Sequence, residues 1–163
     1  MAAVYRQWAF HGAAFHYVSS SPWQLYTPLA EMCEASEFPP GSFHLRSFRL
    51  RDHMLRRLLL IRRKGKAKVI RTLLKTFPRR RFVFIGDSGE ADSEMYGRLA
   101  RTNPHQVAGI FIRLLDTGPS HDERVTKTLS GLGDTIVRIF RCPTELPIDL
   151  ASIASDVPLL AGG

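Results

Sequence analysis

The stretch FVFIGDSGEAD, residues 82–92, decides the fold, because an apolar segment runs directly into a loop with two carboxylates. Apolar residues followed by Gly86 predict a buried strand that ends in a turn. Asp87 and Asp92 then follow the strand's carboxyl end, where open α/β sheets hold their ligands. Two oxygen ligands on one loop suit Mg²⁺, which binds a few carboxylates together with substrate phosphate and water. The alternative is an ordinary turn, since Gly, Asp and Ser are common turn residues.

On either side of this stretch, segments that favour strands alternate with segments that favour helices. In chain order, we expect strands at 13–18, 42–45, 82–85, 107–114 and 135–140, and helices at 22–36, 49–63, 66–76, 93–101 and 123–132. Ser21 is the expected N-cap of the first helix, with Pro22 at its first position, and Gly65 is expected to interrupt the basic helical region. Such alternation predicts an α/β fold, a Rossmann-like parallel sheet with helices on both faces.

The composition is that of one globular domain. Of 163 residues, 44% are hydrophobic and 23% are charged, which excludes wholesale disorder, and no apolar run approaches the roughly 20 residues that span a bilayer. We expect a domain over residues 1–141 and a proline-containing tail over 142–163. The two cysteines, Cys33 and Cys142, form neither a metal motif nor a disulfide framework, which favours the reducing cytoplasm.

Positive charge is concentrated in one region. Residues 46–81, which we call the basic band, contain fifteen Lys or Arg and one acid, a balance of +14 in a chain whose net charge is +8. Such a band attracts polyanions: nucleic acid, an anionic membrane surface or a phosphorylated substrate. The alternative is a solvated basic face without a partner. The sequence shows neither a recognisable DNA-recognition helix nor a basic strand that carries several aromatic residues, so nucleic acid is not an expected partner.

Several kinds of site can be weighed against the acidic loop. There is no phosphate-binding P-loop and no zinc-protease motif. The six histidines show no ligand spacing, and His16 is expected to be packed within its strand. Ser88 could be a hydrolase nucleophile, but the nucleophile elbow needs Gly where this chain has Glu90. A serine esterase is therefore the weaker alternative.

Phosphoryl transfer accounts for more of the candidate site residues than any other chemistry. The serines at the end of the first strand, Ser19 among them, could hydrogen-bond a phosphoryl oxygen near a helix N-terminus. A lysine before the acidic loop, Lys66 or Lys68, could neutralise the charge that develops on that group. Asp87 and Asp92 would hold Mg²⁺. Each residue also has a purely structural explanation, but their order at successive strand ends favours a phosphate site.

The chain also resembles a known family. The stretches YRQWAFHGAAFHYVSSSPWQLY, FPPGSFHLRSF and KVIRTLLKTFPRRRFVFIGDSGEADSEMYGRLARTNPHQVAGIFIR are similar to the catalytic domain of the actin-patch-type phosphatidate phosphatases, over about residues 1–115. That family belongs to the haloacid dehalogenase superfamily. The resemblance implies Mg²⁺-dependent removal of phosphate from phosphatidate, an anionic phospholipid, to give diacylglycerol.

The resemblance also implies roles for individual residues. Ser19 matches the phosphate-binding serine of the second motif, and Lys66 matches the lysine of the third, with Lys68 as the fallback. Asp87 and Asp92 match the acidic pair that positions Mg²⁺. The substrate implies an anionic membrane surface as partner, so we expect a cytoplasmic protein that attaches peripherally to membranes.

One family motif is absent from this sequence. The superfamily's first motif, DxDx[TV], supplies an aspartate nucleophile on the central first strand, and these 163 residues contain no such sequence. Without it no aspartyl-phosphate can form. We therefore expect that Met1 is an internal start, that the fold lacks its first strand, and that this chain alone does not turn over. The alternative function is a non-catalytic fragment that binds anionic lipid.

Overall fold

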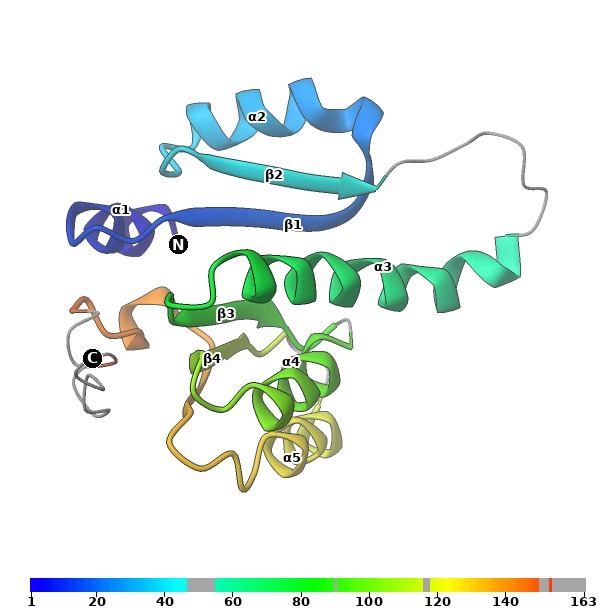
Figure 1. Ribbon diagram of the computed structural model, residues 1–163, viewed down its shortest axis with the longest axis vertical. Coiled ribbons are helices and arrows are strands. Elements are labelled where there is room, and N and C mark those ends of the chain that lie inside the picture. The colour runs from blue at the N-terminus through cyan, green and yellow to red at the C-terminus, as the bar shows by residue number, and fades with distance from the viewer. Residues whose placement is uncertain (47–54, 90, 116–117, 150–152, 154–163) are drawn as a thin grey trace. The chain divides into compact units, whose positions relative to one another are not determined.

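The computed structural model describes residues 1–46, 55–89, 91–115, 118–149 and 153, without the side chains of 55–64 and 119–121. The chain forms two compact units, Met1–Thr76 and Phe77–Gly163. In both units, parallel strands are accompanied by helices (Figure 1). The predicted α/β class, with parallel sheets flanked by helices, is therefore confirmed.

The first unit is built on a pair of parallel strands. Its elements are α1 (Ala2–Phe10), β1 (Phe15–Pro22), the 3₁₀ helix η1 (Trp23–Leu25), α2 (Tyr26–Ala35), β2 (Gly41–Arg46) and α3 (Leu55–Thr76). β1 pairs with β2, and α3 lies alongside β1 (Figure 1). The ring of Tyr5 in α1 contacts that of Phe15 in a tilted arrangement, with ring centroids 5.2 Å apart, and meets Phe38 edge-on. These aromatic contacts attach α1 to the strand pair.

The second unit contains a three-stranded parallel sheet in the order β3-β4-β5. Its elements are β3 (Phe82–Asp87), α4 (Asp92–Thr102), β4 (Val107–Arg113), α5 (Pro119–Thr128), β5 (Ile136–Phe140) and the 3₁₀ helix η2 (Pro143–Glu145). β4 is buried over all but its last residue, as expected for the central strand of a covered parallel sheet. α4 packs on β3 and β4, and α5 packs on α4. The carboxyl ends of the three strands therefore share one edge.

The described strands form two sheets rather than one. Within the described residues, β1 has β2 as its strand neighbour and β3 has β4. The predicted domain boundary at residue 141 stays a prediction. Leu146 and Ile153, beyond that boundary, are buried.

Local expectations were wrong at three places. β1 extends to Pro22 and is followed by η1, so Ser21 does not cap a helix. Gly65 lies inside α3 without interrupting it, because one glycine costs only about 1 kcal/mol in a helix of strong helix formers. The helix predicted at 123–132 begins earlier, at Pro119. The first part of the basic helix predicted from Arg49 falls on residues 47–54, outside the described residues.

The helix α1 was not expected from the sequence. It is short and carries no side-chain cap at its N-terminus, so the usual start signal is missing. Its stop signal is present, because Gly12 follows it with φ of +86°, a conformation that glycine adopts readily. Trp8 is buried on its inner face and stacks on Tyr5. Tertiary packing rather than propensity therefore stabilises this helix.

Candidate functional site

The acidic loop, residues 86–92, follows β3 at the carboxyl edge of the second sheet. Asp87 is the last residue of β3, and its Oδ1 accepts a hydrogen bond from the backbone N–H of Gly89 at 2.9 Å. This local bond turns the chain away from the sheet. Asp92 begins α4 and is only 4% exposed. The structure thus places both predicted carboxylates in one short loop, while Glu90 lies outside the described residues.

Gly86 allows the Asp92 carboxylate to lie against the backbone of β3. A Cβ atom at position 86 would be 2.4 Å from Asp92 Oδ2 and 2.9 Å from its Cγ. Real Cβ atoms essentially never come closer than 3.0 Å to another atom. Glycine is therefore the residue that fits here, and its lack of a side chain leaves room for the buried Asp92 carboxylate at the strand end.

The N-terminus of α4 suits this concentration of acids. Asp92 and Glu94 lie in its first turn, where the partial positive charge of a helix stabilises carboxylates. The hydroxyl of the buried Ser93 donates to Glu94 Oε2 at 2.9 Å. Arg124 of α5 forms an ion pair with Glu94 at 3.3 Å. Neighbouring groups therefore orient Glu94, while Asp92 lies beside Gly86.

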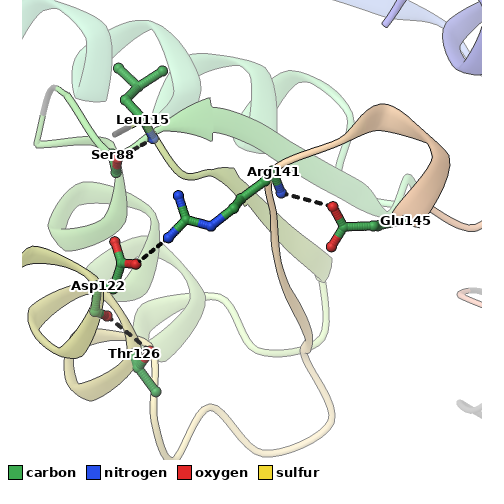
Figure 2. Close-up of polar contacts among 6 residues, drawn as sticks. All are labelled: Ser88, Leu115, Asp122, Thr126, Arg141 and Glu145. Atoms are coloured by element: carbon green, nitrogen blue, oxygen red, sulfur yellow. Dashed lines mark hydrogen bonds and ion pairs between the residues drawn. The ribbon is translucent and has the colours of Figure 1, made fainter. Parts of the chain in front are cut away.

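Ser88 is part of the framework of the loop. It is fully buried, and its Oγ accepts a hydrogen bond from the backbone N–H of Leu115 at 3.0 Å (Figure 2). The Ser88 N–H also donates to the carbonyl of Arg113 at 2.9 Å. These two bonds continue the β3-β4 pairing beyond the strands. A buried hydroxyl used in this way is poorly placed to attack a substrate, which argues against the esterase alternative.

The donor chemistry of the acidic loop fits Mg²⁺. Asp87 and Asp92 offer carboxylate oxygens, and Mg²⁺ in phosphate sites takes one or two carboxylates and completes its shell with phosphate and water. Within the described residues, no group of three His, Cys, Asp or Glu could form a fuller cage. Asp87 and Asp92 are the described residues that could contribute to such a site.

Ser19 and Lys66 lie in the first unit. Ser19 Oγ accepts from the Ser21 N–H at 3.1 Å and donates to Ser21 Oγ at 3.0 Å, in the part of β1 where the register with β2 shifts. Such irregularities are common beside functional sites. Lys66 is half-buried in α3, whereas Lys68 is exposed. The assignment of Ser19, Lys66, Asp87 and Asp92 as site residues stays a prediction.

An ion-pair cluster at the end of β5 was not expected from the sequence. The Arg141 guanidinium donates to Asp122 Oδ2 at 2.6 Å, and the Arg141 backbone N–H donates to Glu145 Oε1 (Figure 2). Glu145 Oε1 also accepts from the backbone N–H of Cys142. Asp122 Oδ1 is buried and has no hydrogen-bond partner within the described residues. Arg141 directly follows the strand that was predicted at 135–140, but nothing in the sequence indicates that it pairs with Asp122.

Comparison with known proteins identifies the family. Residues 1–114 match the family described as "Phosphatidate phosphatase APP1, catalytic domain". The chain belongs to that family. It is 34% identical over 122 residues to the phosphatidate phosphatase APP1 of Saccharomyces cerevisiae, covering 72% of this chain and 20% of that protein. It is 33% identical over 102 residues to an uncharacterized protein of Schizosaccharomyces pombe, covering 62% and 16%.

The APP1 catalytic-domain match covers all four predicted site residues and ends before the Arg141–Asp122 pair. The chain spans about a fifth or less of the length of the two yeast relatives. No solved structure matches it. Among the residues described, there is no helix of the length and apolar character needed to cross a membrane.

Proposed function

We propose that this chain supplies the phosphate- and Mg²⁺-binding part of a phosphatidate phosphatase that converts an anionic phospholipid to diacylglycerol. The observation that carries the proposal is the acidic loop, in which Gly86 lets Asp92 lie against β3 at the strand end that Asp87 completes. Family membership supports the lipid phosphate as substrate, since the yeast relative is named as a phosphatidate phosphatase.

Each residue has a role in this proposal. Asp87 and Asp92 would hold Mg²⁺, which when bound neutralises phosphate oxygens and orients the phosphate. The Ser19 hydroxyl would exchange its bond to Ser21 for one to a phosphoryl oxygen. Lys66 would contribute a positive charge that balances the phosphate. The attacking carboxylate has no counterpart here, because the sequence contains no DxDx[TV] motif.

The first unit also suits a lipid surface. Trp23, Leu25 and Tyr26 follow β1 directly and are 59%, 44% and 52% exposed. Trp and Tyr are enriched where membrane meets water, because their rings are apolar at one end and polar at the other. The basic band adds attraction to anionic headgroups. We propose that this surface attaches the protein, from the cytoplasm, to membranes that contain its substrate.

Co-sedimentation with vesicles tests the proposal. The full chain is mixed with phosphatidylcholine vesicles that contain either phosphatidate or phosphatidylserine, with and without Mg²⁺. We expect Mg²⁺ to favour binding to phosphatidate, and Asp87→Asn to weaken that binding by about tenfold or more, since a charged contact contributes roughly 1.5–3 kcal/mol. Asp134→Asn, an exposed acid before β5, makes the same charge change and should leave binding unchanged.

The outcomes separate the proposed function from its alternative. One outcome is that neither Mg²⁺ nor Asp87→Asn changes vesicle binding, whereas salt abolishes it. This result would contradict the phosphate site and favour a lipid-binding fragment. Equal binding to both lipids would also count against phosphatidate as substrate. Phosphate release from phosphatidate is expected to be absent with this chain alone. Its presence would show that a nucleophile other than a DxDx[TV] aspartate acts here.

A further inference from the structure

Three polar side chains meet on one face of the β1-β2 pair, away from the acidic loop in sequence. His16 is opposite Ser42, and Val18 is opposite His44 in the parallel register. Because side chains alternate between faces along a strand, His16, Ser42 and His44 share one face. The aromatic residues Phe15, Tyr17 and Phe43 occupy the intervening positions. No local pattern indicates this arrangement, since the two histidines are 28 positions apart in the chain.

The distances between the polar atoms of this group resemble the distances between neighbouring ligand atoms in a metal site. His16 Nδ1 and Ser42 Oγ are 2.6 Å apart, Ser42 Oγ and His44 Nε2 are 2.9 Å apart, and the two nitrogens are 3.4 Å apart. In a tetrahedral zinc site with metal–nitrogen bonds of 2.0–2.1 Å, two ligand atoms lie about 3.3 Å apart. The imidazole nitrogens therefore already have the separation that one shared ion requires.

The chemistry of the group also suits a metal ion. A neutral imidazole offers a nitrogen lone pair to a metal. In the absence of a metal, the Ser42 hydroxyl can donate to one nitrogen and accept from the other, which satisfies the cluster by hydrogen bonds alone.

We propose that His16 and His44, with the Ser42 hydroxyl beside them, bind a Zn²⁺ ion. Imidazole nitrogen suits Zn²⁺ and related transition metals, whereas Mg²⁺ prefers carboxylate oxygen. This site is therefore separate in chemistry from the acidic loop and does not depend on the proposed function. Two imidazoles leave coordination positions for the hydroxyl and water. The ion would cross-link β1 to β2.

Zinc titration of the full chain tests this site. Zn²⁺ binding is measured by calorimetry in the presence of excess Mg²⁺, with both cysteines replaced by serine because free thiols bind Zn²⁺. We expect one ion per chain. His16→Gln and His44→Gln should each weaken binding by about tenfold or more, since changes outside the ligand shell alone cost roughly 10- to 100-fold. His11→Gln and His105→Gln, two exposed histidines elsewhere, should bind as the parent does.

A gain of affinity provides the second test, in case the histidine variants fold poorly. Ser42→Cys places a thiolate where the hydroxyl lies 2.6 Å and 2.9 Å from the two nitrogens. We expect it to tighten Zn²⁺ binding and, with Co²⁺ as a substitute, to add a thiolate absorption band. Binding that neither histidine substitution weakens, or no tightening with Ser42→Cys, would show that the cluster is only a hydrogen-bonded strand contact.

Discussion

Gly86→Ala tests how the acidic loop holds its carboxylate. The new Cβ would lie 2.4 Å from Asp92 Oδ2, whereas ordinary contacts begin near 3.4 Å. Either the Asp92 side chain or the β3 backbone must therefore move by about 1 Å. Asp92 is almost completely buried at the start of α4, so there is little space into which it can move. The substitution combines overpacking with displacement of a buried acid.

The expected magnitude follows from these contacts. Overpacking of a buried position costs about 1–3 kcal/mol, which lowers the melting temperature by roughly 2–4 °C per kcal/mol in a chain of this size. Gly109→Ala is a matched control in the same unit. There the added Cβ would have its nearest neighbours at 3.4 Å, and reduced freedom of the unfolded chain should stabilise the protein by about 0.4–1 kcal/mol.

The assay is urea denaturation followed by far-UV circular dichroism, with amide hydrogen exchange in β4 as a second readout of the same unit. We expect Gly86→Ala to lower the free energy of unfolding and Gly109→Ala to leave it equal or higher. A Gly86→Ala variant as stable as the parent would refute the contact between Gly86 and Asp92. The same substitution should also weaken any Mg²⁺ response, because Asp92 would have moved.

Two further predictions concern other buried groups. Ser88→Ala removes the acceptor of the Leu115 N–H and should lower the free energy of unfolding by about 1–3 kcal/mol. Urea denaturation measures this change, and an unchanged value would contradict a structural role for Ser88. Burial raises the pKa of Tyr17 to about 12 and also raises the pKa of Tyr5, while the pKa of an unfolded tyrosine is about 10. The stability that these tyrosines contribute should therefore be fully present below pH of about 10 and should decline as the pH rises towards 12. Urea denaturation at several alkaline pH values measures this decline. Tyr17→Phe should reduce it.

The fold could largely be predicted where local pattern and tertiary packing agree. β3 and β4 were expected because their apolar runs are bounded by turn residues, and both form as parallel strands, β3 partly buried and β4 almost fully buried. Where long-range packing decides, sequence was insufficient. α1 depends on aromatic contacts to Phe15 and Phe38, which no local signal indicates. The predicted interruption at Gly65 was wrong because the free-energy cost of one glycine in a helix is small compared with the helix preference of its neighbours.

The position of the acidic loop in the fold was predictable to a similar extent. Strand-end position alone located Asp87 and Asp92, since carboxyl ends of parallel strands are identifiable from turn residues. The supporting contacts were not predictable: neither the approach of Asp92 to Gly86 nor the Arg141–Asp122 pair leaves a sequence signal. The histidines show the same limit. His16 was expected to be merely packed, and only the strand register brings it to His44.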